Sequence, residues 1–377
     1  MSDRASDIRV RGGYHFTVLK IDLATGEIER VAIGEQFALE HIGGPGLQVL
    51  VGGAFLPRQA GAALDTGNTL VLAPGPLTGL ALPGSSRCHI MALLPDTGLV
   101  VGGSIGGALG PAIRRAGYDA VVIAGRAAAL SYLTIDEDRV EIVAAPRIAG
   151  MSARAASDTI RGELGRDHVA TAAIGPAGER EVSVAIISSG GPSAGSGSPL
   201  ESEKPPRAEP RGGHHCAGGG LGAVMGGKNL KAIAVSGGKE PPVADPAGLA
   251  VIAERLPSEV RCPVDCEAGC RFKWLGPSGR HGGRLGRPSH DPALSPALAR
   301  AYDELGLDSK GAGGPRRRRR PTPEAMLLDL LGLCYQPWLE MEGGIDLAAE
   351  CYRAVTGVEW RVEELVKAAR AGFPTGS

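Results

Sequence analysis

The segment Cys216-Ala-Gly-Gly-Gly-Leu-Gly-Ala-Val-Met-Gly-Gly-Lys-Asn-Leu-Lys-Ala-Ile-Ala-Val235 joins a glycine-rich loop to an apolar run that ends as a strand. Glycine has no Cβ, so backbone amides in such a loop can approach a ligand closely. Lys228 and Lys231 follow the loop and could neutralise a phosphate. A surface turn with solvated lysines is the alternative when this loop is considered alone.

A second glycine-rich segment lies upstream, where Gly102-Gly-Ser-Ile-Gly-Gly-Ala-Leu-Gly110 precedes a helical pattern at 111–116. Backbone amides and the partial positive charge at the start of a helix favour an anion such as a phosphate. The spacing differs from the dinucleotide-binding fingerprint, and no strand–helix–strand unit surrounds it. A tight turn is the alternative, so this loop indicates a phosphate site only together with other motifs.

Outward from these loops, the first 240 residues have the pattern of strands with a few helices. Residues 15–23 and 27–33 flank Ala-Thr-Gly26 and predict a β-hairpin with a glycine-containing turn. Further strand-like runs, separated by turn-forming residues, occupy 69–73, 88–94, 120–124, 130–135, 140–143, 168–174 and 182–188. Helical patterns fit 35–42, 108–116 and 152–164.

The pattern changes near Gly237-Gly238 and the Pro241-Pro242 pair. Apolar residues then recur at three- and four-residue spacing, which predicts helices at 246–255, 296–305, 323–333, 345–355 and 362–369. The sequence therefore predicts an α+β fold, with a β-rich domain at 1–240 followed by a shortened, mostly α-helical region at 241–377. A low-complexity insertion at 188–213 and a linker at 309–321 are expected, because serine, glycine, proline and charged residues dominate there.

Composition restricts the classes of function. The chain has 377 residues and a formal net charge of −1, so no overall basic field favours nucleic acid or a membrane surface. The arginine run at 316–320 is interpreted as part of a solvated linker. No run approaches the roughly 20 apolar residues that span a bilayer, and the N-terminus lacks an apolar signal core. A cytoplasmic location is expected, and there clustered cysteines indicate metal binding more than disulfides.

Four cysteines are the candidate metal ligands. Cys262, Cys266 and Cys270 follow one another at four-residue steps, and Cys334 lies far downstream. Thiolates select zinc or iron–sulfur clusters. Four-cysteine zinc sites usually show two C-x2-C pairs, so the arrangement of three plus one favours iron–sulfur, with zinc as the competitor. Buried free cysteines are the remaining alternative, and Cys88 and Cys351 are assigned to the core on that basis.

A short motif occurs twice in the C-terminal region. Asp303-Glu-Leu-Gly-Leu-Asp308 and Asp329-Leu-Leu-Gly-Leu-Cys334 share the pattern D-x-x-G-L-[D/C]. Two copies of one motif suit a ligand whose two halves are chemically alike.

Together these motifs resemble the tungsten-containing aldehyde:ferredoxin oxidoreductase family. Besides the cysteines and the paired motif, the resemblance is carried in order by Leu19-Lys-Ile-Asp-Leu-Ala-Thr-Gly26, Ile42-Gly-Gly-Pro-Gly-Leu47, Ala73-Pro-Gly-Pro-Leu-Thr-Gly79, 83–87, 106–110, Ala116-Gly-Tyr-Asp-Ala120, Ile174-Gly-Pro-Ala-Gly178 and 220–235. It implies a tungsten (or molybdenum) bis-pyranopterin beside a four-iron four-sulfur cluster. It also implies a β-rich base for the pterins, covered by helices.

The resemblance further implies particular site residues. Cys262, Cys266, Cys270 and Cys334 would ligate the cluster. The pterins would be bound by residues of the two repeats, namely Asp303, Gly306, Leu307, Asp308, Asp329, Gly332 and Leu333. Pterin phosphates and a bridging magnesium would be held by Arg87, Gly106, Gly107, Ala217, Gly218 and Gly219. The implied reaction is oxidation of a small aldehyde to a carboxylic acid, with electrons passing to ferredoxin; a homodimer is left open.

The chain departs from the family pattern in several places. Its cysteines are spaced C-x3-C-x3-C instead of C-x2-C-x3-C, and His214-His215 stand where an arginine motif is expected. Pro45 and Ser104 replace an expected arginine and an expected magnesium-binding asparagine. Only 20 residues separate Asp308 from Asp329, and no catalytic residue is identifiable. The alternative function is therefore a catalytically degenerate member, or an electron-transfer or assembly subunit without a substrate channel.

Overall fold

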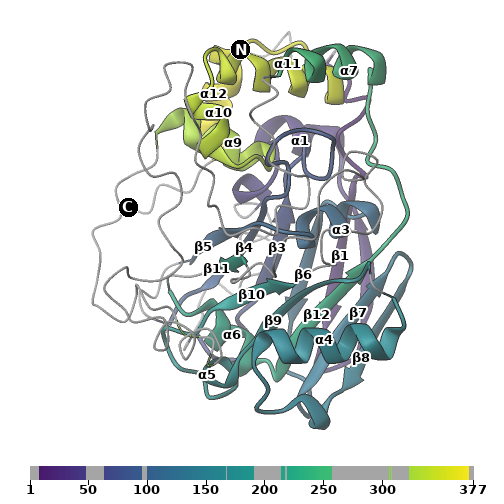
Figure 1. Ribbon diagram of the computed structural model, residues 1–377, viewed down its shortest axis with the longest axis vertical. Helices are drawn as coiled ribbons and strands as arrows, with labels where there is room; N and C mark the ends of the chain where they lie inside the picture. The colour runs from purple at the N-terminus through teal and green to yellow at the C-terminus, as the bar shows by residue number, and fades with distance from the viewer. Residues whose placement is uncertain are drawn as a thin grey trace, which may run out of the picture.

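The computed structural model describes residues 8–47, 63–95, 100–166, 168–190, 214–216, 219–256, 305, 307 and 322–372. Within them two six-stranded mixed sheets are followed by a layer of helices (Figure 1). This confirms the predicted α+β fold. Within the described residues, no helix is both long enough and apolar enough to span a bilayer.

The first sheet is built from the N-terminal third of the chain. Its strands are β1 (Thr17–Asp22), β2 (Ile28–Ala32), β3 (Leu70–Pro74), β4 (Cys88–Leu93), β5 (Val100–Ile105) and β6 (Ala120–Ala124). Their order is β2-β1-β6-β3-β4-β5, and only the β1–β6 pair is parallel. The predicted hairpin is confirmed as β1–β2, with Gly26 at φ +76° in its turn.

The second sheet repeats this arrangement. Its strands are β7 (Ser131–Asp136), β8 (Arg139–Ala144), β9 (Ala170–Ile174), β10 (Ile187–Gly190), β11 (His214–Cys216) and β12 (Leu230–Ser236). Their order is β11-β10-β9-β12-β7-β8, and only the β7–β12 pair is parallel. Strand n of the first sheet therefore corresponds to strand n + 6 of the second.

The helices between strands follow the same plan. Helix α1 (Glu35–His41) precedes β3, and α4 (Ala153–Leu164) precedes β9. Helix α3 (Leu109–Arg115) leads into β6, and α6 (Leu221–Gly227) leads into β12. We call residues 17–124 the first unit and residues 131–236 the second unit. The second also contains η2 (Pro146–Ile148) and the single turn α5 (Pro176–Glu179).

Apolar side chains of both sheets form the main core. Leu72, Ile90 and Ile123 of the first sheet pack in one cluster with Leu133, Ile174 and Ile233 of the second. The alternation of strand residues places every second side chain in this cluster. On the outer face of the second sheet, small alanines at 173, 232 and 234 accommodate α4, whose Ala156 and Ile160 are buried against them.

The C-terminal helices form a second apolar cluster. They are α7 (Pro246–Arg255), α9 (Pro323–Leu331), α10 (Tyr335–Glu340), α11 (Gly344–Thr356) and α12 (Val362–Gly372). Leu328, Trp338 and Tyr352 from these helices pack with Leu77 and Leu82 of the first unit. Figure 1 shows this layer at the top, above one end of the sheets.

Three sequence expectations need correction. The strand expected at 182–188 starts only at Ile187, and Ser188–Gly190 belong to β10 rather than to a low-complexity insertion. The segment from Gly102 to Ile105, expected as a loop, forms the last four residues of β5. Residues 191–213, most of the helix expected at 296–305 and most of the linker at 309–321 lie outside the described residues. The domain boundary near residue 240 stays a prediction.

Candidate functional site

The second copy of the D-x-x-G-L motif lies against the first unit. The Leu331 carbonyl accepts a hydrogen bond from Leu77 N at 3.0 Å, and the Gly332 carbonyl accepts one from Arg87 N at 3.2 Å. Cys334 N donates to the Gly84 carbonyl at 2.9 Å. These backbone contacts fix the segment 329–334 on the connection between β3 and β4.

Glycines permit this close approach. Gly332 has φ +81°, and a Cβ there would lie 2.0 Å from Thr78 Oγ1. On the facing segment, a Cβ at Gly75 would lie 2.2 Å from Gly332 N. No other residue fits at either position without moving backbone, which explains the glycine of the repeated motif.

Arg87 and Cys334 meet at this contact. Arg87 Nη2 donates to Cys334 Sγ at 3.0 Å, although 247 positions separate the two residues in sequence. Cys334 is 3% exposed. Hydrogen bonds from a guanidinium are strongest to an ionised acceptor, and the thiolate is the form that binds metals. This environment therefore fits a thiolate ligand.

The other three predicted ligands, Cys262, Cys266 and Cys270, lie outside the described residues. Among the described residues no group of three His, Cys, Asp or Glu side chains is placed to hold a metal. The four-cysteine centre stays a prediction. Cys88 and Cys351 are buried core residues, as predicted, and burial raises the pKa of the Cys351 thiol to about 12. Burial likewise raises the pKa of the Cys88 thiol well above its ordinary value.

The first copy of the motif is represented by Leu305 and Leu307, since its other residues lie outside the described part of the chain. Leu307 forms a β-bridge with Ala185 and packs against Ala177 and Ala223. Ala185 stands just before β10, as Arg87 stands just before β4. The two copies of the motif therefore contact equivalent places on the two units.

The two glycine loops are also equivalent. Gly106 and Gly107 connect β5 to α3, and Gly219 and Gly220 connect β11 to α6. Gly107, Gly219 and Gly220 all have positive φ. Strands β5 and β11 contact each other, so the two loops leave neighbouring strands. Ala217 and Gly218 lie outside the described residues.

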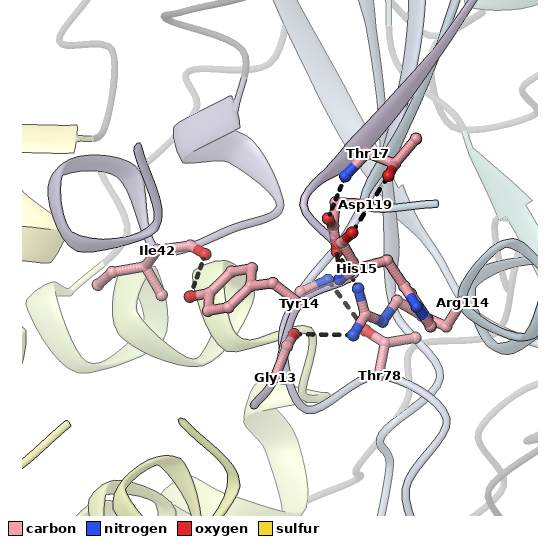
Figure 2. Close-up of polar contacts among 9 residues, drawn as sticks. Gly13, Tyr14, His15, Thr17, Ile42, Thr78, Arg114 and Asp119 are labelled. Carbon is pink, nitrogen blue, oxygen red and sulfur yellow. Dashed lines mark hydrogen bonds and ion pairs between the residues drawn. The ribbon is translucent and has the colours of Figure 1, made fainter. Parts of the chain in front are cut away.

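A buried ion pair anchors the far end of α3 (Figure 2). Arg114 pairs with Asp119 and donates from Nη2 to the Gly13 carbonyl at 2.7 Å. Asp119 accepts from His15 N and Thr17 N, each at 3.1 Å. Burial first, and the Arg114 charge second, lower the pKa of His15 to about 4. This network fixes the helix that carries the Gly106–Gly107 loop.

The phosphate role considered for Lys228 and Lys231 is not supported by their positions. Lys228 Nζ donates to the carbonyls of Asn68 and Gly125, and Lys231 Nζ donates to the Met151 carbonyl and pairs with Glu179. Both residues are buried. Lys231 lies in β12, a central strand whose residues are all buried, and Lys228 ends α6 just before it, so both ammonium groups bind the protein itself.

Lys228 makes the stability of the chain depend on alkaline pH. Burial lowers its pKa from the ordinary 10.5 to about 8. Between pH 8 and 10.5 the unfolded chain therefore binds more protons at this residue, so stability rises with pH in that window. Lys228→Met is expected to remove a rise of up to about 1.4 kcal/mol per pH unit. Denaturant unfolding at several pH values measures it; Lys20→Met, at a half-exposed hairpin lysine, should keep the rise. An unchanged slope in Lys228→Met would contradict the assignment.

The sequence did not single out His89, a polar residue inside the apolar run 88–94. Its side chain is 9% exposed, and Nε2 lies 3.8 Å from Asp329 Oδ1. Among the described residues neither ring nitrogen has a hydrogen-bond partner. The signal in the sequence that could have indicated this buried histidine is its position between apolar residues of a strand-like run.

Comparisons with known proteins give the following. Residues 18–237 match the model of the aldehyde ferredoxin oxidoreductase N-terminal domain. The chain is 34% identical over 247 residues to the tungsten-containing aldehyde ferredoxin oxidoreductase of Pyrococcus furiosus. This alignment covers 64% of this chain and 36% of that protein. It is 34% identical to the protein of the same name from Thermococcus kodakarensis, covering 60% of this chain and 34% of that one. The chain thus spans about a third of the length of these relatives.

A solved structure is similar as well. The active-site complex BamBC of benzoyl coenzyme A reductase, in complex with 1,5-dienoyl-CoA, matches with a TM-score of 0.57 and 31% identity. The match covers 65% of this chain and 34% of the other.

Proposed function

The chain belongs to the aldehyde ferredoxin oxidoreductase family, and we propose that it oxidises an aldehyde to a carboxylic acid at a tungsten (or molybdenum) bis-pyranopterin. Electrons would leave through a four-iron four-sulfur cluster to ferredoxin. The relatives are named as tungsten-containing aldehyde ferredoxin oxidoreductases, and that name supports the metal and the reaction class. A homodimer and a cytoplasmic location stay predictions.

One observation supports the proposal, namely that the fold and the motif are both duplicated. The two units share one topology, and each contacts one copy of the D-x-x-G-L motif at an equivalent place. A bis-pyranopterin has two alike halves. Each half would be bound by one copy, so Asp329, Gly332 and Leu333 would serve one pterin, and Asp303, Gly306, Leu307 and Asp308 the other.

The glycine loops would bind the phosphates of the two pterins. Gly106 and Gly107 follow β5 in the sequence, and Ala217, Gly218 and Gly219 follow β11. Because β5 and β11 are neighbours, both loops can contribute backbone groups to one place where two phosphates and a magnesium ion would meet.

Arg87 and Cys334 would form the contact between cofactor and cluster. Cys334 would supply the fourth thiolate, and Arg87 would hold it by donating to Sγ. Arg87 is expected at a pterin phosphate, and its guanidinium contact with the thiol would give it a second role beside the cluster. The chemistry that the bound groups supply is a two-electron oxidation that converts an aldehyde and water into a carboxylic acid, two electrons and two protons.

Metal and pterin analysis of the purified full chain tests the proposal. Tungsten or molybdenum together with about four irons per chain is expected, because thiolate ligands select iron–sulfur clusters, along with a pterin that fluoresces after acid release. Zinc alone would contradict both the cluster and the cofactor. Iron without pterin would contradict the bis-pyranopterin and leave an electron-transfer role.

A further inference from the structure

His89 and Ser104 lie opposite each other on the outer face of the first sheet. They are paired residues of the antiparallel strands β4 and β5, so their side chains share one face. His89 is 7% exposed, and the Ser104 hydroxyl is buried. Asp329 of α9 lies beside His89, with Oδ1 3.8 Å from His89 Nε2.

These polar groups do not satisfy one another. Both ring nitrogens of His89 and the Ser104 hydroxyl lack a hydrogen-bond partner among the described residues. Folded proteins pair nearly all buried polar groups, because an unpaired one keeps the cost of leaving water. An imidazole and a hydroxyl left unpaired beside a carboxylate therefore indicate that a ligand supplies their partners.

The second unit shows that such a pair can satisfy itself. Ser188 on β10 stands where His89 stands on β4, and His215 on β11 stands where Ser104 stands on β5. There the same two residue types, in exchanged order, make a hydrogen bond of 2.8 Å between Ser188 Oγ and His215 Nδ1. Since the fold permits this bond, its absence between His89 and Ser104 is not imposed by the sheet.

We propose that His89 hydrogen-bonds the pyranopterin that the 329–334 segment binds, as a direct contact beside Asp329. This rests on the proposed function, and it assigns a residue that neither the repeated motif nor the glycine loops contain. An imidazole can donate from one nitrogen and accept at the other, while a carboxylate only accepts. The two side chains together match the edge of a pterin ring, which carries N–H donors beside nitrogen and oxygen acceptors.

The test compares retention of the pterin with stability of the unloaded chain. Full-length wild type, His89→Leu, His89→Gln and His15→Leu are produced with tungstate in a host that makes pyranopterin. Pterin is counted by fluorescence after acid release, at intervals during dilution. Unloaded chains are unfolded in denaturant. His15→Leu is the matched control, because His15 Nε2 is also buried without a partner among the described residues, while the backbone N–H that His15 donates to Asp119 is kept in the variant.

His89→Leu is expected to lose pterin roughly tenfold faster than wild type, because a ligand hydrogen bond is removed. His89→Gln, which keeps a donor and an acceptor, should stay within about threefold of wild type. The unloaded His89→Leu chain should be at least as stable as wild type, because an apolar side chain replaces unpaired polar atoms.

Three results would overturn the inference: wild-type retention in His89→Leu, a loss of stability or of folding in the unloaded His89→Leu chain, or an equal loss of pterin in His15→Leu. The first would mean that water or nothing partners the imidazole. A wild-type chain that never contains pterin would instead overturn the proposed function, so the two failures are distinguishable.

Discussion

Cys334→Ser is expected to abolish the broad visible absorption of an iron–sulfur cluster in the purified chain. Cys334 is the predicted ligand that the described residues include, and its sulfur accepts a hydrogen bond from Arg87 at 3.0 Å. A serine hydroxyl is a poor substitute, because thiolates are the ligands that such clusters select. Loss of most of the roughly four irons per chain should accompany the loss of colour.

The control for this experiment is Cys351→Ser. Cys351 is also a buried cysteine, but it lies inside α11, and burial raises the pKa of its thiol to about 12. It should keep its visible spectrum and its iron while losing some stability. Cys266→Ser, at a ligand outside the described residues, should behave like Cys334→Ser. Full absorption in Cys334→Ser would remove this cysteine from the cluster.

The second large effect is expected at Arg114. Arg114 and Asp119 expose 1% and 2% of their side chains, their ion pair joins α3 to the residue before β6, and both side chains hydrogen-bond the segment before β1 (Figure 2). Arg114→Met leaves the Asp119 carboxylate buried without its counter-ion. Breaking a buried pair from one side costs about 3–5 kcal/mol of unfolding free energy. Denaturant unfolding of the full chain measures the loss.

Arg139→Met is the matched control for Arg114→Met. Arg139 and Glu141 form an ion pair on the same strand, β8, and their side chains are 73% and 48% exposed. Exposed pairs contribute at most about 1 kcal/mol. Similar losses in the two variants would show that burial of the Arg114 pair does not decide its contribution.

Local patterns predicted much of the fold. The hairpin of β1 and β2, strands such as β6 and β9, and the helices α4, α7 and α11 follow from alternating or helical spacing, which short stretches of sequence contain. Strand β5 was missed because Gly102 and Gly103 resemble a loop, although a strand tolerates glycine where another backbone comes close. At Gly102 a Cβ would lie 2.1 Å from the Ile90 carbonyl oxygen. The three-residue strand β11 is too short to show any period.

The sequence predicted which motifs belong to the candidate site, but not how the fold brings them together in space. The D-x-x-G-L copies, the loops and Cys334 were found from their residue types. That the copies contact equivalent places on two units depends on strand pairing between distant segments, which no local pattern encodes. The same holds for the contact of Arg87 with Cys334, and for Lys228 and Lys231, whose partners are backbone carbonyls far away in sequence.

In each unit the first strand pairs in parallel with the last strand, and this has a consequence for the order of folding during synthesis. Strand β1 pairs with β6, so the first unit is complete once residue 124 has left the ribosome, and the second closes at β12. Domains generally fold in the order of their synthesis. The segment around Cys334 can dock onto Gly84 only after the chain has been made to residue 334. The two sheets can therefore form before α9 is made, and α9 then docks onto a first unit that is already folded.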